Sequence, residues 1–271
     1  MNIGRKLVPA AVGLAFSVLA LPAFAGSCAG LPSWGQLQSA LAGAVGASGN
    51  GGLGFNMWGA IVANDGTVCS VAFSGSNYTS QWLGSRVIAA QKANTANDFS
   101  LSKGAPPAGS LFPSGLALST ANLYSAVQPG GSLYGLQHSN PVDPVEAYQG
   151  NAFLYGTPND PMVGQRVGGV NVFGGGLALY KKGGIKIGAV GVSGDQSCTD
   201  HFVAWHVRHN LKLDFLGGIG VVPGNDAQHP DNIIFDITPN PSGGTGISKN
   251  GFGHPTCVNT GNPASLPAVS S

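Results

Sequence analysis

Residues 177–192 read LALYKKGGIKIGAVGV, and this stretch decides the fold. Two apolar runs, 177–180 and 185–192, flank Gly183-Gly184, a two-residue turn typical of β-hairpins. Ser193-Gly194-Asp195 come next, and the residues from about Ser197 to Leu211 have a helical pattern. A hairpin that leads directly into a helix indicates a domain in which strands and helices pack together.

The N-terminal half repeats this alternation. A helix is predicted over 34–45, with Ser33 as its N-cap. Two apolar runs, 55–63 and 68–73, are joined at Asn64-Asp65-Gly66, where Asp-Gly favours a tight turn and a second hairpin. A helix over 79–98 and a short helix over 121–127 follow. We therefore expect an α/β (α+β) domain that covers residues 26–212.

Three segments are expected to be irregular. Residues 102–118 and 138–174 are rich in proline or glycine, which interrupt regular structure. Residues 213–271 form a Gly/Pro/Asn-rich C-terminal extension that we expect to wrap the domain. Its only strand-like run is 233–237.

The composition excludes some classes of protein. Only 8% of the 271 residues are charged and the net charge is +1, so the chain lacks the basic surface by which proteins bind nucleic acid. There is no run of like charges that would indicate a disordered tail.

Residues 1–25 have the pattern of a signal peptide. A basic start at Arg5 and Lys6 precedes an apolar run over 7–21, and Ala23-Phe24-Ala25 fits signal peptidase cleavage before Gly26. The run is too short to span a bilayer. A lipoprotein signal fits less well, because the residues before Cys28 lack a large aliphatic side chain. We expect a periplasmic or secreted protein with no membrane span.

Four cysteines lie beyond the expected cleavage site. An even number in an oxidising compartment predicts two disulfides. Three connectivities are possible, and we favour Cys28–Cys69 and Cys198–Cys257, since each joins a terminal segment to the nearest predicted core element. Metal binding is the alternative, but the sequence has no C-x-x-C spacing.

Enzyme signatures are missing. The sequence has no H-E-x-x-H, no P-loop, no G-x-S-x-G and no dinucleotide-binding fingerprint. Asp195 and Asp200 are better explained as acids at a helix start than as a catalytic pair. No catalytic constellation is found, and catalysis is not expected.

The histidines carry the most chemical interest. His201, His206 and His209 lie on the predicted helix over 197–211, on the side opposite its apolar stripe, with Phe202 and Trp205. Such a face suits a subunit interface, a flat aromatic ligand or a metal, and the sequence leaves these three open. His138 stands alone at the start of the long loop and is a possible axial ligand of haem iron.

Several stretches together resemble the GlcG/HbpS-like haem-binding family, which is related to the C-terminal domains of PduO-type proteins. SRVIAAQKANTA (85–96) resembles its A-x-x-K-A-x-T-A helix, and WGAIVANDG (58–66) is similar to its first strand pair. GGLAL (175–179), IGAVGVSG (187–194) and Asp200 resemble its glycine-rich signature. The resemblance covers about 34–137 and 175–211.

This resemblance implies an antiparallel sheet of about five strands with helices packed on it, a homo-oligomer, and a haem or related tetrapyrrole as the ligand. Haem storage, sensing or degradation would be its role. The motif residues Thr95, Gly175 and Gly176 are then expected at the haem site. Lys92 and Arg86 are the expected partners of the haem propionates.

The chain also departs from the family pattern. The helix over 34–45 has no histidine, so a ligand that some relatives take from this helix is missing. Residues 138–174 are inserted and 213–271 are appended. We therefore nominate His138 as the iron ligand, with His206 and His209 next. The alternative is a non-haem oligomeric module in which Phe202, Trp205 and His206 are buried between subunits.

Overall fold

The computed structural model describes residues 27–244 and 246–271, and its centre is one antiparallel sheet. The four strands are β1 (Trp58–Ala63), β2 (Val68–Phe73), β3 (Gly176–Lys181) and β4 (Ile185–Ser193). Their order is β2-β1-β4-β3, so the two hairpins join through β1 and β4. The expected signal peptide, residues 1–25, lies outside the described residues.

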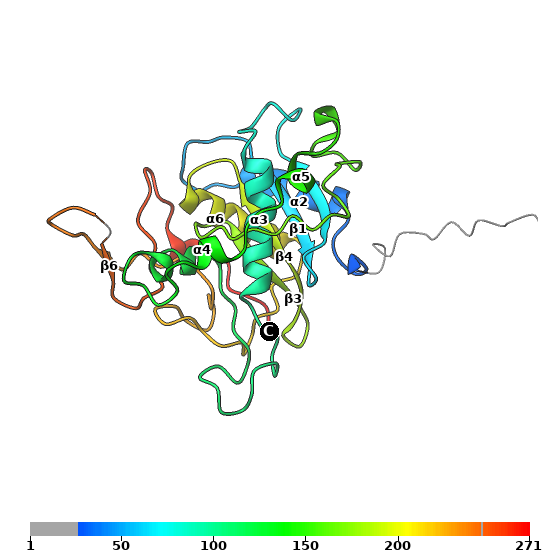
Figure 1. Ribbon diagram of the computed structural model, residues 1–271. Coiled ribbons are helices and arrows are strands. Elements are labelled where there is room, and N and C mark those ends of the chain that lie inside the picture. The colour runs from blue at the N-terminus through cyan, green and yellow to red at the C-terminus, as the bar shows by residue number, and fades with distance from the viewer. Residues whose placement is uncertain (1–26, 245) are drawn as a thin grey trace, which may run out of the picture.

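Helices cover both faces of this sheet (Figure 1). Helix α3 (Ser85–Asp98) lies on one face, while α2 (Trp34–Val45) and α6 (Ser197–Asn210) pack together on the other. The alternation along β1 explains the two layers of core. Ala60 and Val62 belong to the cluster under α3, and Ile61 belongs to the cluster under α2 and α6.

Glycines in the sheet let α3 approach the strands closely. A Cβ atom on Gly191 would lie 1.9 Å from the carbonyl oxygen of Ala89, and one on Gly176 would lie 2.3 Å from that of Lys92. Both contacts are with helix backbone, which cannot move aside. The glycine-rich signature therefore serves the packing of α3 on the sheet.

Most predicted elements are confirmed. Both hairpins are present, and α2 begins after Ser33, whose side chain accepts a hydrogen bond from the Gln36 backbone in a capping box. Helix α3 begins at Ser85 rather than at Thr79, because Asn77 accepts hydrogen bonds from Thr79 and holds a turn there. The expected helix over 121–127 consists of two short 3-10 helices, Thr120–Leu123 and Ser125–Val127.

The expectation of about five strands is corrected to four. The outer edges of the sheet are paired with irregular segments instead of a further strand. The Val68 amide donates to the Gln165 carbonyl on the β2 side, and the Tyr180 amide donates to the Leu213 carbonyl on the β3 side. In the strand-like run 233–237 only the last residue is in a strand, β5 (Ile237–Thr238), which pairs with β6 (Ile247–Ser248).

The inserted residues 138–174 run along the outer side of α3. They include part of α4 (Leu136–Ser139), then α5 (Pro144–Tyr148) and the 3-10 helix Ala152–Leu154. Asn94 of α3 donates to the carbonyl of Gly169, and Thr95 accepts from the Asn171 amide. This cover explains why a helix with so many polar residues is buried between the sheet and the insertion.

The C-terminal extension covers α6, as expected for a segment that wraps the domain. It is joined to α6 by the disulfide Cys198–Cys257, while Cys28–Cys69 holds the N-terminal segment to β2. Both favoured pairings are therefore present. The extension ends with a short 3-10 helix, Pro263–Ser265. Among the described residues, no helix is both long and apolar enough to cross a membrane.

One sequence interpretation is corrected by this cover. The Trp205 indole donates a hydrogen bond to the Pro267 carbonyl (2.9 Å) and lies beside His229, and Phe202 is equally buried. These aromatic rings pack against the extension of their own chain. They are not free to form a subunit interface.

Candidate functional site

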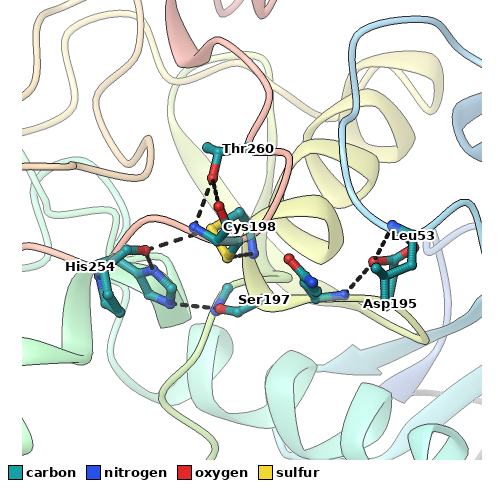
Figure 2. Close-up of a disulfide and its surroundings, with 10 residues drawn as sticks. Leu53, Asp195, Ser197, Cys198, His254 and Thr260 are labelled. Atoms are coloured by element: carbon teal, nitrogen blue, oxygen red, sulfur yellow. Dashed lines mark hydrogen bonds between the residues drawn. A yellow bond between two sulfur atoms is a disulfide. The ribbon is translucent and has the colours of Figure 1, made fainter.

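A dense polar junction lies where α6 begins (Figure 2). Ser197 Oγ lies 2.6 Å from His254 Nε2 and accepts a hydrogen bond from the Gly174 amide. His254 Nδ1 lies 2.6 Å from the Pro255 carbonyl oxygen, which can only accept, so Nδ1 carries the proton and Nε2 accepts from Ser197. Burial lowers the pKa of His254 to about 4, and the ring is neutral at pH 7.

The same junction holds the loop before β1. Asp195 accepts hydrogen bonds from the backbone amides of Leu53 (3.0 Å) and Phe55 (3.2 Å), while its own amide donates to Asp200. The disulfide Cys198–Cys257 lies beside it (Figure 2). The junction therefore joins four segments of the chain at the start of α6, and most of its polar groups bond one another, while Gln196 Oε1 and Thr199 Oγ1 have no partner among the described residues.

Lys92 lies behind this junction and is fully buried. Its Nζ is 2.5 Å from Asp200 and 3.1 Å from the Val192 carbonyl oxygen, with the Phe173 ring 4.0 Å away. Burial raises the pKa of Asp200 and lowers that of Lys92. The pair stays in place because each charge is matched by the other.

Arg86 is the second buried cation of α3. Its Nε donates to Asp160 (2.9 Å), its Nη1 donates to the Ala147 carbonyl (2.8 Å), and the guanidinium lies 3.6 Å from the centre of the Tyr155 ring. All three partners belong to the insertion. In the structure, both cations expected near the propionates are thus buried and paired with aspartates.

The partners of two buried side chains of α6 were not predicted from the sequence. Arg208 forms a bidentate pair with Asp231 (2.6 and 2.8 Å), and His201 lies 3.2 Å from Asn232 Oδ1. Burial lowers the pKa of His201 to about 3. Both partners lie in the extension, more than 20 residues away, and no motif in the sequence signals either contact.

The end of α6 is open, in contrast. His209 is one-third exposed and its Nδ1 lies 2.7 Å from the buried carboxylate of Asp214. Within the described chain, His209 Nε2 has no hydrogen-bond partner. His206 is half-buried and its ring has no partner within the same range, while burial lowers its pKa. His138 is exposed on α4, far from this helix in sequence.

The remaining predicted residues are buried structural positions. The Thr95 hydroxyl donates to the Gln91 carbonyl and accepts from the Asn171 amide. Gly175 and Gly176 lie where β3 begins, against Lys92 and Thr120. The structure therefore brings Lys92, Gly175 and Gly176 together, and it separates them from Arg86 and His138.

A groove lies between α2 and the open end of α6. Its volume is about 610 Å³, within the usual range for small-molecule sites. The residues that directly follow His209 form one wall of it. The lining consists of Pro32, Gly35, Gln36, Ser39, Ala40, Asn210, Leu211 and Lys212.

This end of α6 has the donors that a haem iron uses. A histidine that binds a metal commonly gives its other ring N–H to a carboxylate, which fixes the tautomer and leaves one nitrogen free. His209 and Asp214 have this arrangement. The described residues contain no group of three or more His, Cys, Asp or Glu side chains suited to a bare metal ion.

Two solved structures match this chain. A crystal structure titled as a PduOC–heme complex matches with 23% identity and a TM-score of 0.40, over 65% of this chain and 89% of that chain. The Klebsiella pneumoniae protein ORFY matches with 22% identity and a TM-score of 0.39, over 65% of this chain and 86% of that chain.

A search of curated proteins finds no match. The family model described as haem degrading protein HbpS-like matches residues 53–208, which include the whole sheet, α3 and nearly all of α6. This span is more than half of the chain. The protein belongs to the HbpS-like family.

Proposed function

We propose that this protein binds haem. The observation that carries the proposal is the family match, which covers the entire sheet, α3 and nearly all of α6. Haem binding needs an apolar recess with a few polar anchors and an axial donor to iron. The open end of α6 supplies the imidazole of His209, and the groove beside it supplies a recess with apolar and polar lining residues.

His209 is the proposed axial ligand. Its Nδ1–H donates to Asp214, so its Nε2 has the lone pair and is accessible. The carboxylate also holds the plane of the imidazole. The protein's own contribution is thus a preoriented nitrogen, and a bound haem would supply iron chemistry there.

The groove between α2 and α6 supports this site. Some relatives are expected to take an iron ligand from their first helix, and α2 has no histidine. Helix α6 packs against α2, and His209 directly precedes the groove residues Asn210, Leu211 and Lys212. Lys212 is exposed in its lining and is the proposed partner of a propionate.

This proposal ranks the nominated residues anew. His138 and His206 stay candidates, but neither has a carboxylate that orients the ring. Arg86 and Lys92 could reach a propionate only after leaving Asp160 and Asp200, at the cost of an unpaired buried charge. Thr95, Gly175 and Gly176 support the core of the same domain.

A hemin titration tests the function. The visible spectrum of the purified protein should change saturably at one hemin per chain, with a Soret band typical of nitrogen ligation. His209→Ala should remove this band, while His138→Ala serves as the matched control and should retain it. A wild-type spectrum identical to hemin in buffer would refute haem binding.

Export is proposed on separate grounds. Both disulfides are of the kind that persist in oxidising compartments, and no free cysteine is left among the described residues. Expression in a bacterium with its native N-terminus should give a periplasmic or secreted protein that begins at Gly26. Mass spectrometry of the purified chain identifies its first residue. An uncleaved chain found in the cytoplasm would contradict export. Homo-oligomers stay a prediction, which sedimentation velocity tests.

A further inference from the structure

A second pocket lies between the loop after β2 and the insertion. Its volume is about 510 Å³. Four of the eight lining side chains are aromatic and none is charged. The lining consists of Phe73, Ser76, Asn77, Tyr78, Thr79, Phe153, Tyr155 and Thr157.

The aromatic rings form walls at right angles. Tyr78 is nearly perpendicular to Phe153 (5.8 Å between ring centres, 83°) and to Tyr155 (6.5 Å, 81°). Phe153 is 77% exposed, which is unusual for a ring of this size in a well-ordered turn. The pocket thus offers aromatic faces to solvent, and these faces attract polarised C–H groups.

Neutral hydrogen-bonding groups surround these rings. The Tyr78 hydroxyl has no partner among the described residues. Asn77 Oδ1 accepts from Thr79 and Asn77 Nδ2 donates to Ser76 Oγ (3.4 Å), so one of the two N–H groups of this amide remains for a ligand. Thr157 donates its hydroxyl proton to the Leu154 carbonyl and accepts from the Asn159 amide (3.2 Å), so one lone pair of its oxygen remains for a ligand.

The insertion wall is held in place by buried contacts. Arg86 binds Asp160 and the Ala147 carbonyl, and its guanidinium stacks on Tyr155. The Tyr155 hydroxyl donates toward the carbonyls of Tyr148 and Gln149. Because Tyr155 is fixed before a ligand arrives, this wall of the pocket adds little ordering cost to binding.

We propose that this pocket binds a neutral saccharide. A pyranose has one face of C–H groups that can stack on Phe153 or Tyr78, and a rim of hydroxyls that can bond Asn77, Tyr78 and Thr157. A dianionic ligand such as haem would find no cation in the lining. A purely apolar ligand would leave the hydroxyl and amide groups unpaired.

The test uses cellopentaose, maltopentaose and chitopentaose as probes, with saturation-transfer NMR and calorimetry on the full mature chain. At least one probe should bind saturably at the pocket. Phe153→Ala should weaken it about tenfold or more, since a stacked ring contributes on the order of 1 kcal/mol beyond its buried area. Phe153 is exposed, so this variant keeps its fold. Tyr78→Ala should have a similar effect.

Tyr134→Ala is the matched control, because Tyr134 is 70% exposed on another segment. It should leave saccharide affinity unchanged, and Phe153→Ala should leave hemin binding unchanged. A neutral ligand should also keep its affinity within about twofold when NaCl rises from about 50 to about 500 mM. The proposal is overturned if no probe binds, or if binding survives both aromatic variants.

Discussion

The two ends of α6 differ in what covers them, although both carry histidines. His201 lies in the first half, beneath the C-terminal extension, where burial keeps its ring neutral and Asn232 is its partner. His209 lies in the last turn and is one-third exposed. Its Nδ1 contacts Asp214, and its Nε2 has no partner among the described residues. Coverage, and not residue type, decides which histidine is available to a ligand.

Buried contacts between α6 and the C-terminal extension should be more sensitive to mutation than exposed ion pairs. Arg208→Ala leaves Asp231 buried without its cation, and we expect a loss of about 3–5 kcal/mol in the free energy of unfolding. Arg166→Ala breaks an exposed pair with Asp65 and should cost less than about 1 kcal/mol. Urea denaturation compares the two variants. Equal losses of unfolding free energy in the two variants would mean that the extension does not bury the Arg208–Asp231 pair.

The disulfide Cys198–Cys257 tests the same contact between α6 and the extension. Replacing Cys198 and Cys257 together by alanine opens a loop of 59 residues between them. Loop-closure entropy gives an expected loss of about 4 kcal/mol. Proteolysis should also cut the extension first, while β1–β4 remain protected. An unchanged unfolding free energy in the double variant would show that the extension is held by its other contacts alone.

Protonation of His254 should destabilise the fold at acid pH. His254 has a pKa near 6.5 when unfolded and about 4 when folded, because burial penalises its charged form. The unfolded chain therefore binds more protons between these values, and stability is lost as the pH falls through this window. His254 alone accounts for on the order of 3 kcal/mol. His201, lowered to about 3, adds in the same direction.

Unfolding free energies measured from pH 7 to pH 4 check this dependence. His254→Asn should flatten the slope in that range, even though it lowers the overall stability. His138→Asn is the control, because the His138 ring is exposed and should leave the slope as it is. If His254→Asn had the same slope as the wild type, the burial of His254 would be contradicted.

A smaller effect is expected at the open end. Asp214→Asn keeps the shape of the side chain but removes the charge that orients His209. Hemin affinity should fall about tenfold to a hundredfold, the usual effect of losing such a partner. Asp226→Asn, near the exposed side of His229, is the control and should leave hemin affinity unchanged.

The hairpins and α2 could be predicted because each has a local signal. Asp-Gly and Gly-Gly mark the two turns, and Ser33 marks a helix start. The number of strands could not be predicted, since the sheet edges pair with irregular backbone near Gln165 and Leu213.

The candidate site was less accessible to sequence reasoning. The spacing of His206 and His209 places them on one side of α6, but nothing in the sequence says that Asp214 orients one of them. The partners of Arg86 and Arg208 lie in the insertion and in the extension, which have no periodic pattern. Contacts between distant irregular segments leave no trace in local spacing.

The most direct test of the account is chemical rescue at His209. Visible spectra of hemin-loaded wild type and His209→Gly should differ by loss of the nitrogen-ligated band in the variant. Adding free imidazole to His209→Gly should restore that band, because the ligand fills the space left by the ring. If His209→Gly retains the wild-type spectrum before imidazole is added, His209 is not the iron ligand and the open end of α6 is not the haem site.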